Sequence, residues 1–138
     1  MKIIIGADHG GFELKEIIKE HLDKKGISID DVGTFDTSSV DYPDIAVKVC
    51  NKLLAKEGDF GILICGTGIG ISITANKIHG IRAALCSDEF SARATRAHNN
   101  SNVLCLGGRV TGPELAKSIC DAFLSGSNNT AHLCFQCQ

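Results

Sequence analysis

The amino-acid sequence predicts a three-layer α/β domain built on a parallel sheet of five strands. Five short apolar runs alternate along the chain with segments in which apolar residues recur at every third or fourth position. The links between these segments are short and rich in glycine and polar residues. Alternation of this kind is typical of parallel strands joined by right-handed helical crossovers, with helices on both faces of the sheet.

The length of 138 residues is that of one domain. We expect this domain to span residues 1–124, because no linker, repeat or low-complexity segment divides them. The last stretch, residues 125–138, is polar and then rich in cysteine, and its pattern predicts neither a helix nor a strand.

The first strand is predicted at the apolar run Lys2–Ala7. Apolar residues from Phe12 to Leu22 then recur at helical spacing, and Gly26 follows as the signal that ends this helix. Over residues 27–32 apolar and polar residues alternate, which indicates a second strand with one buried face.

The second helix is predicted to open at residues 41–44, with Pro43 in its first turn. Phe60–Cys65 is apolar apart from one glycine, as expected of a third strand that is covered on both faces. A glycine-rich turn then leads into a third helix, which runs to about Lys77.

The fourth strand is predicted at residues 81–86, and Ser87 or Asp88 caps the helix that follows, which runs to about Ala97. Residues 102–106 predict the fifth strand. Thr111 is the expected cap of the last helix, which carries proline and glutamate in its first turn and ends near position 124.

Composition excludes several classes of function. Lys and Arg number 14 against 16 Asp and Glu, which gives a net charge of −2 and no electrostatic footprint for nucleic acid or an anionic membrane. Aromatic residues make up only 5% of the chain, so a base-stacking surface is not expected. Apolar stretches are far shorter than the ~20 residues that span a bilayer, and the N-terminal residues do not match a signal peptide. We therefore expect a cytoplasmic protein without a membrane or nucleic-acid partner.

The chain contains seven cysteines, an odd number at irregular spacing. Five of them lie within apolar stretches, where the expected role is that of a small reduced thiol in the core. Cys134 and Cys137 form one pair at metal-ligand spacing, but no second pair accompanies it. Neither a disulfide framework nor a metal site is therefore predicted.

Residues that carry chemistry follow three of the predicted strands. Asp8 and His9 follow the first strand, Cys65 ends the third, and Arg109 follows the fifth. In open parallel sheets, ligands bind beyond the carboxyl ends of the strands, so we expect these residues to share one edge. His98 follows the fourth helix instead, which places it at the opposite end of the sheet unless the end of this helix, or another subunit, brings it to the site.

Residues 66–70 (GTGIG) form a glycine-rich turn between the third strand and its helix. Backbone N–H groups of such a turn can approach a ligand closely, and the helix N-terminus favours an anion, such as a phosphate, a carboxylate or a developing enediolate. Ile71 stands where a dinucleotide fingerprint requires glycine and where a Cys-x5-Arg phosphatase requires arginine. Beside this turn, Cys65 is a candidate base or nucleophile. Thr67 can donate a hydrogen bond to a reacting oxygen.

The remaining candidates supply acid–base chemistry and anion binding. The imidazole of His9 beside Asp8 suits proton transfer near neutrality, and His98 beside Asn99 offers a second such group. Arg109 suits a phosphate. Each feature alone also fits a structural role, such as a tight turn, a packed thiol or a surface ion pair. Together they predict an enzyme that moves a proton between adjacent carbons of a phosphorylated sugar.

Seven short segments carry a resemblance to a known family. They are GADHGG at 6–11, SVDYPD at 39–44, ICGTGIG at 64–70, ANK at 75–77, IRAA at 81–84, HN at 98–99 and GGR at 107–109. In combination they are highly specific, and over residues 1 to about 124 the chain resembles ribose-5-phosphate isomerase of type B. The same family contains the subunits of galactose-6-phosphate isomerase.

The resemblance implies a Rossmann-like fold and a homodimer or tetramer whose active sites are shared between subunits. It implies that Cys65 is the base that moves a proton between C1 and C2, and that Asp8 and His98 assist opening of the sugar ring. The groups implied to stabilise the enediolate are Gly66, Thr67, Gly68, Ile69 and Gly70. Those implied to bind the sugar hydroxyls and the phosphate are His9, Tyr42, Asn99 and Arg109. The resemblance implies no metal and no organic cofactor.

The C-terminal residues depart from the family pattern. Family members usually carry two arginines near positions 132 and 136 that hold the phosphate, whereas this chain has His132 and Gln136 and no arginine after Arg109. His132 is the candidate substitute. The predicted reaction is the interconversion of D-ribose 5-phosphate and D-ribulose 5-phosphate through an enediolate, a step of the pentose phosphate pathway, with weakened phosphate binding. The alternatives are isomerisation of allose 6-phosphate or galactose 6-phosphate, and sugar-phosphate binding without catalysis.

Overall fold

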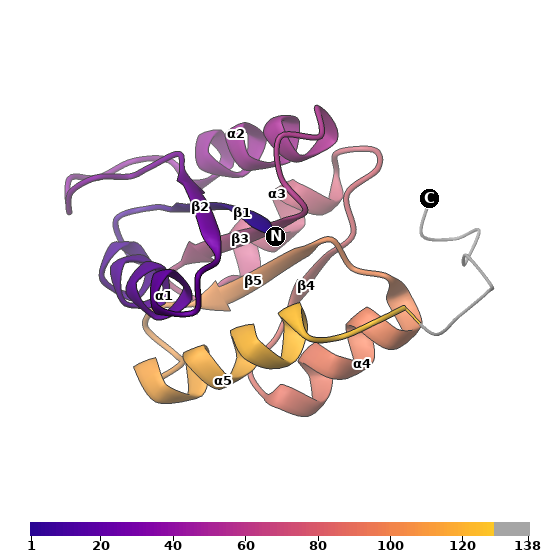
Figure 1. The fold of residues 1–138 in the computed structure, drawn as a ribbon. Helices are drawn as coiled ribbons and strands as arrows, with labels where there is room; N and C mark the ends of the chain where they lie inside the picture. Colours follow the sequence, from indigo (N-terminus) through magenta and orange to yellow (C-terminus); the bar gives the residue numbers. More distant parts are fainter. Residues whose placement is uncertain (129–138) are drawn as a thin grey trace.

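Within residues 1–128, which the computed structural model describes, five parallel strands form one sheet in the order β2-β1-β3-β5-β4 (Figure 1). The elements in chain order are β1 (Lys2–Ala7), α1 (Phe12–Lys24), β2 (Ser28–Asp31), α2 (Tyr42–Leu54), β3 (Phe60–Cys65), α3 (Ile69–Asn76), β4 (Ala83–Leu85), α4 (Glu89–Asn99), β5 (Val103–Gly107) and α5 (Pro113–Leu124). The predicted α/β fold with a parallel sheet of five strands is confirmed.

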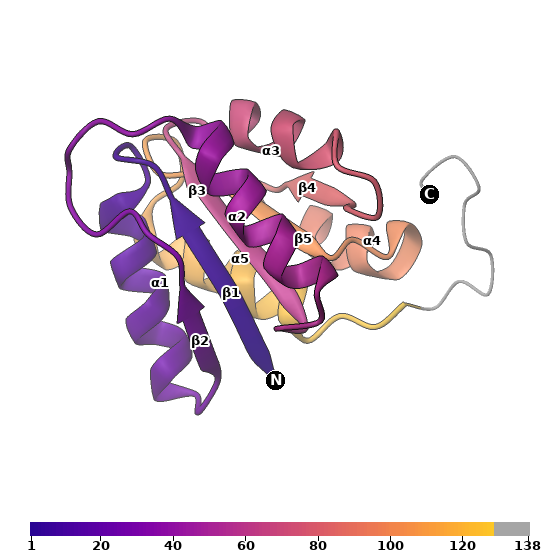
Figure 2. The same ribbon diagram turned by 90° about the horizontal axis from the view of Figure 1, so that it is seen from above.

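The sheet lies between two layers of helices, with α2 and α3 on one face and α1, α4 and α5 on the other (Figures 1 and 2). Successive strand residues point to opposite faces, so each strand contributes to two apolar clusters. On β1, Ile3 and Ile5 pack in the cluster that contains residues of α1 and α5, whereas Ile4 packs in the cluster that contains residues of α2. Both faces are buried, which is why β1 and β3 are almost wholly apolar in sequence.

Several predicted boundaries shift by one or two residues, and two of the differences have a clear cause in side chains or turns. Strand β4 is shorter than the predicted run 81–86, since the N–H of Arg82 donates to the side-chain oxygen of Asn102 at 2.8 Å. Thr111 does not cap α5. The N-cap is Gly112, and it makes no side-chain capping hydrogen bond. Thr111 is buried beside it.

Helix α4 begins as predicted but ends later. Asp88 is its N-cap, and its carboxylate accepts a hydrogen bond from the N–H of Ser91 at 2.6 Å. The helix continues through Asn99, so His98 lies in its last turn and not beyond its end. Asn100 then takes a left-handed backbone conformation with φ of 49°, which is a common way to end a helix.

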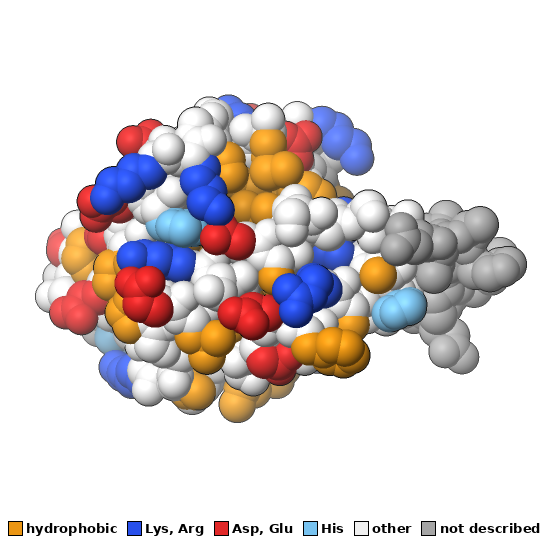
Figure 3. All heavy atoms as spheres, turned by 60° about the horizontal axis from the view of Figure 1, so that its bottom comes forward, with side chains coloured by type: hydrophobic (Ala, Val, Ile, Leu, Met, Phe, Trp, Pro, Cys, Tyr) orange, Lys and Arg blue, Asp and Glu red, His pale blue; other side chains and the backbone are white. Residues whose placement is uncertain are grey.

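Charged side chains of both signs are interspersed over the face that carries α4 and α5 (Figure 3). One pairing ties α1 to α5: Asp121 lies 2.8 Å from His21 Nε2 and 2.8 Å from Lys25 Nζ. None of the helices within residues 1–128 has the length and apolar character needed to cross a membrane.

The cysteines among the described residues are unpaired and buried, namely Cys50, Cys65, Cys86, Cys105 and Cys120. Burial raises the pKa of the Cys50 and Cys86 thiols to about 11. The prediction of unpaired thiols in the core is confirmed for Cys50, Cys86, Cys105 and Cys120, while Cys65, which is also buried, is the candidate base or nucleophile. The pair at positions 134 and 137 lies outside the described residues.

Candidate active site

The candidate site lies where the three central strands end side by side. Strand β3 pairs with β1 on one side and β5 on the other, with Ala7 opposite Ile64 and Cys65 opposite Gly107. The residues that follow these strands therefore meet at one edge of the sheet, as predicted. They include Asp8, Cys65, the 66–70 turn and Arg109.

Cys65 contributes a nearly buried thiol, only 4% exposed, to this edge. Its Sγ accepts a hydrogen bond from the N–H of Gly68 at 3.1 Å. Gly68 is the N-cap of α3, so the positive end of the helix dipole also points toward the sulfur. Both features complement negative charge at this position, which is what a base or nucleophile requires.

The turn holds its shape because glycine occupies positions that no side chain could share. Gly68 has φ of +79°, and a Cβ on it would lie 2.5 Å from Leu85 Cδ1 and 2.9 Å from the backbone of Leu106. At the end of β5, a Cβ on Gly107 would lie 2.6 Å from the carbonyl oxygen of Thr67. The sequence predicts a close turn here, and the structure shows that strand β5 also contributes to it.

Replacing Gly68 by alanine should displace the turn and abolish its function. The left-handed conformation and the backbone contact together should lower the free energy of unfolding by about 1–3 kcal/mol. Gly26→Ala is the matched control, because Gly26 also has positive φ, +75°, but nothing lies within 4 Å of its Cβ position. We expect loss of catalytic turnover of ~100-fold or more in Gly68→Ala only, measured beside thermal unfolding of both variants. Equal turnover in the two variants would contradict a functional role for the turn.

Thr67 and Tyr42 flank the two ends of this turn. The hydroxyl oxygen of Thr67, an exposed residue, accepts a hydrogen bond from the N–H of Ile69 at 3.2 Å, which leaves its hydroxyl hydrogen able to donate elsewhere. Tyr42, the first residue of α2, lies against Gly70: a Cβ on that glycine would be 2.6 Å from the tyrosine Cζ. A phenol and a hydroxyl thus stand beside the N-terminus of α3.

Asp8 and His9 form the wall of the site next to β1. Asp8 is 6% exposed, and its Oδ1 accepts hydrogen bonds from the N–H groups of Gly10 at 2.8 Å and Gly11 at 3.2 Å. His9 Nδ1 accepts the N–H of Val40 at 3.3 Å. A ring nitrogen that accepts carries no hydrogen, so in the neutral imidazole the proton lies on Nε2.

Arg109 places a cation over the 66–70 turn. Its backbone N–H donates to the carbonyl of Gly66 at 2.9 Å, and its Nη1 lies 3.2 Å from the point that a Cβ on Gly66 would occupy. The side chain is exposed and its guanidinium is therefore available to an anionic ligand. A Cβ at position 66 would require this guanidinium to shift by a few tenths of an ångström.

His98 and Asn99 do not join this edge. They lie in the last turn of α4, at the opposite end of the sheet, and both are exposed. Asn99 lines a pocket of about 580 Å³ with Asn76, the last residue of α3, and with the segment that leads into β4. Sequence reasoning anticipated this separation. His132 lies outside the described residues, and among those described no group of three or more His, Cys, Asp and Glu side chains could hold a metal ion.

Comparison with known proteins identifies the family. The sequence model of the Ribose/Galactose Isomerase family matches residues 3–133. The chain belongs to this family. It is accordingly an isomerase.

Comparisons with individual proteins support the same family assignment. Ribose-5-phosphate isomerase B of Escherichia coli is 52% identical over 123 residues, which cover 89% of this chain and 83% of that protein. The solved structure of ribose-5-phosphate isomerase B from Clostridium thermocellum has a TM-score of 0.96 and 47% identity, and the match covers 99% of this chain and 93% of that one. A D-erythrulose-4-phosphate isomerase of Pectobacterium atrosepticum is 44% identical over 126 residues, 90% of this chain and 82% of that protein.

Sequence reasoning missed that the segment between β2 and α2 contributes to the candidate site. The N–H of Val40 reaches His9 from this segment, and no side-chain pattern signals a backbone donor. The motif at residues 39–44 was the available signal, although it was interpreted through Tyr42 alone.

Proposed function

We propose that the protein interconverts D-ribose 5-phosphate and D-ribulose 5-phosphate through an enediolate, with Cys65 as the base. The observation that carries the proposal is the 3.1 Å hydrogen bond from the N–H of Gly68 to Cys65 Sγ at the N-terminus of α3. It combines a proton acceptor with an anion-stabilising turn in one structural unit. Relatives that share about half of the sequence are named for this activity.

The proposed proton transfer begins on the open-chain aldose. Cys65 Sγ removes the proton from C2, and the electron pair of that bond forms the C1–C2 double bond while the carbonyl oxygen on C1 becomes an oxyanion. The backbone N–H groups of the 66–70 turn and the hydroxyl of Thr67 donate to this oxygen. The hydroxyl proton on the C2 oxygen passes to the C1 oxygen. The C2 oxygen then forms the new carbonyl, while the electron pair of the C1–C2 double bond takes the proton from the thiol to form the new C1–H bond. Asp8, with one carboxylate oxygen already held by backbone N–H groups, assists ring opening.

The substrate is held by groups around this centre. His9 donates from Nε2 to a sugar hydroxyl, Tyr42 offers its phenol, and Arg109 binds the phosphate. The chain has no arginine after Arg109, so we expect weaker phosphate binding than in relatives with the C-terminal pair. His132 stays a predicted phosphate contact.

We propose that the protein acts as a homodimer in which each site uses His98 and Asn99 of the other subunit. Helix α3 connects the two ends of the sheet, since it begins beside the Cys65 turn and ends at Asn76, which shares a pocket with Asn99. One face of α3 exposes Ile69 and Ile73, each 53% exposed and four residues apart. Antiparallel pairing of two copies of α3 about a two-fold axis covers these residues and brings the end of α4 in one copy beside Cys65 of the other.

The direct test is formation of ribulose 5-phosphate from ribose 5-phosphate by the purified protein over a wide substrate range. We expect turnover with a KM well above that of relatives that have the C-terminal arginines. Parallel assays with allose 6-phosphate, galactose 6-phosphate and erythrulose 4-phosphate compare the substrates that the family offers. Faster turnover of one of these would reassign the substrate, and binding of ribose 5-phosphate without turnover would identify a non-catalytic sugar-phosphate-binding module.

A cytoplasmic location fits the thiols. Five buried cysteines remain unpaired in the described residues, which suits a reducing compartment, and the proposed base must itself stay reduced. The reaction as written needs no metal or organic cofactor.

A further inference from the structure

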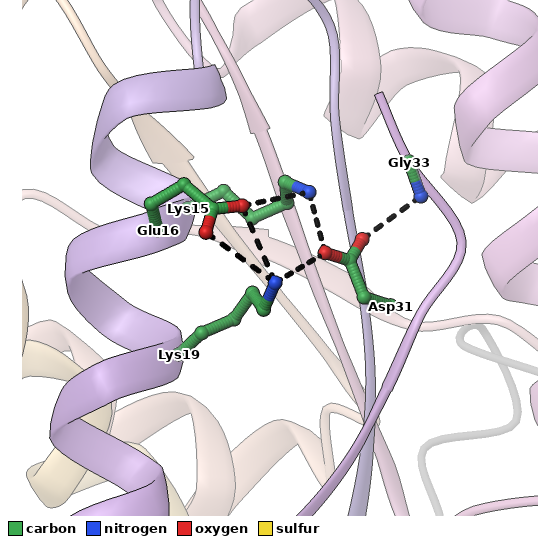
Figure 4. A network of polar contacts seen from close by, with 5 residues as sticks. All are labelled: Lys15, Glu16, Lys19, Asp31 and Gly33. Atoms are coloured by element: carbon green, nitrogen blue, oxygen red, sulfur yellow. Dashed lines mark hydrogen bonds and ion pairs between the residues drawn. The ribbon is translucent and has the colours of Figure 1, made fainter. Parts of the chain in front are cut away.

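Lys15 of α1 is a buried cation that pairs with Asp31 of the edge strand β2 (Figure 4). Strand β1 separates β2 from β3, the strand that ends at Cys65. The Lys15 side chain is 0% exposed, and its Nζ lies 2.6 Å from Asp31 Oδ2. The ammonium also lies 5.5 Å from the ring centre of Phe12 and 5.1 Å from that of Phe35. A lysine is rarely buried without a partner, so this arrangement must offset a large desolvation cost.

Asp31, the last residue of β2, is the centre of the network. Its Oδ2 also receives Lys19 Nζ at 2.7 Å, while its Oδ1 accepts the backbone N–H of Gly33 at 2.9 Å (Figure 4). Burial raises the pKa of Asp31, but the hydrogen bonds from Lys15, Lys19 and Gly33 outweigh burial and leave the pKa below its usual range. The carboxylate is therefore ionised at neutral pH, and it joins α1 to the start of the segment that leaves β2.

This segment begins by pairing with the end of β1. The carbonyl of Gly33 accepts the N–H of Ala7 at 2.8 Å, and the N–H of Thr34 donates to the carbonyl of Ala7 at 2.7 Å. Phe35 follows, 70% exposed, with its ring over the Lys15 ammonium. Cation–π attraction to the buried ammonium favours this position of the ring.

The far end of the segment reaches the site. The N–H of Val40 donates to His9 Nδ1 at 3.3 Å, and Tyr42 lies against Gly70 of the glycine turn. The segment 33–41 is thus held at its start by Asp31 and Phe35, and it supports a histidine and a tyrosine of the site at its end. It contains no helix or strand of its own.

We propose that Lys15 and Asp31 are positioning residues for the isomerase site: they anchor the segment 33–41, and this segment sets the tautomer of His9. With Nδ1 occupied by the Val40 N–H, His9 presents Nε2–H to the substrate as a donor. If the anchor is lost, the Val40 N–H leaves Nδ1 and the ring exchanges between tautomers, one of which presents an acceptor to the same substrate oxygen. The substrate role of His9 rests on the proposed function, but the effect on its tautomer does not.

The test compares Asp31→Asn with Asp30→Asn. Asp30 is the neighbouring residue of β2 and also makes a 2.6 Å pair, but its partner is Lys52 of α2, so this pair does not anchor the segment 33–41. Imidazole ¹⁵N NMR spectra, recorded where the ring is neutral and assigned with His9→Gln, report the tautomer directly. We expect a single Nε2–H tautomer in the wild type and in Asp30→Asn, and an averaged spectrum in Asp31→Asn. Isomerase KM should rise about tenfold in Asp31→Asn, with kcat within about twofold.

Phe35→Ala is a second variant that weakens the same anchor, and it should fold normally because the exposed ring can be removed without opening the core. It should shift the His9 spectrum and KM in the same direction as Asp31→Asn, by a smaller amount. An unchanged His9 spectrum in both variants would overturn the proposal, as would a spectrum that changes equally in Asp30→Asn. If the His9 spectrum changes in both variants but the wild-type protein does not turn over ribose 5-phosphate, the anchoring role of Lys15 and Asp31 stands and the proposed function is rejected.

Discussion

Cys65→Ala is expected to abolish isomerisation while leaving the fold intact. Removal of a positioned acid–base group lowers kcat by about 10²–10⁴-fold, and here the group is proposed to carry both proton transfers. The thiol is small and lies at a strand end, so the cavity left behind should lower stability by only about 1 kcal/mol. The measurements are conversion of ribose 5-phosphate and exchange of the C2 proton with deuterated solvent. Both should vanish together, because both require the same enediolate.

Cys105→Ala supplies the matched control for this loss. Cys105 is a fully buried thiol in the same apolar cluster as Cys65, on the adjacent strand β5, but it lies inside the strand and away from the glycine turn. Burial raises its pKa well above the usual range, so it stays a protonated thiol at neutral pH and cannot take up a further proton. We expect reduced stability and retained kcat. Retained turnover and proton exchange in Cys65→Ala would remove Cys65 from the mechanism.

The fold was predictable because its strands are covered on both faces. Ile3, Ile4 and Ile5 must all be apolar when successive residues enter different clusters, so strand β1 is visible as an uninterrupted run. The boundary of β4 was not visible in the same way. The side chain of Asn102, distant in sequence, takes the N–H of Arg82, and local periodicity contains no information about that contact.

The same distinction holds for the site: residues placed by the order of the strands were predictable, and residues whose roles depend on contacts distant in sequence were not. Strand ends placed Asp8 and Cys65 on one edge, because the order of elements alone determines which ends meet. The role of Lys15 was hidden, since a lysine in an amphipathic helix is expected to face solvent, and only the approach of Asp31 from β2 explains its burial. Val40 was hidden for a different reason: its contribution is a backbone N–H.

Mixed dimers of Cys65→Ala and His98→Ala subunits should recover activity that neither variant has alone. In a dimer with shared sites, one site of the mixed pair receives an intact Cys65 and an intact His98, while the other site lacks both. Co-expression with two affinity tags isolates this mixed dimer. We expect about half of the wild-type turnover per dimer, since one of its two sites is intact. Because His98 is exposed, its replacement should not disturb the fold of either subunit.

A second mixed dimer, Cys65→Ala with Asp8→Asn, tells a shared site from a general rescue by association. Asp8 and Cys65 follow adjacent strands of one sheet, so each site of this pair keeps one defect and no activity should return. Recovery in the first pair and none in the second requires that His98 crosses the interface while Asp8 does not. If neither pair recovers, the exposed α3 face does not bring the end of α4 to a partner's thiol. If His98→Ala alone keeps the wild-type turnover, His98 has no part in the site, because within one subunit α4 ends at the opposite edge of the sheet.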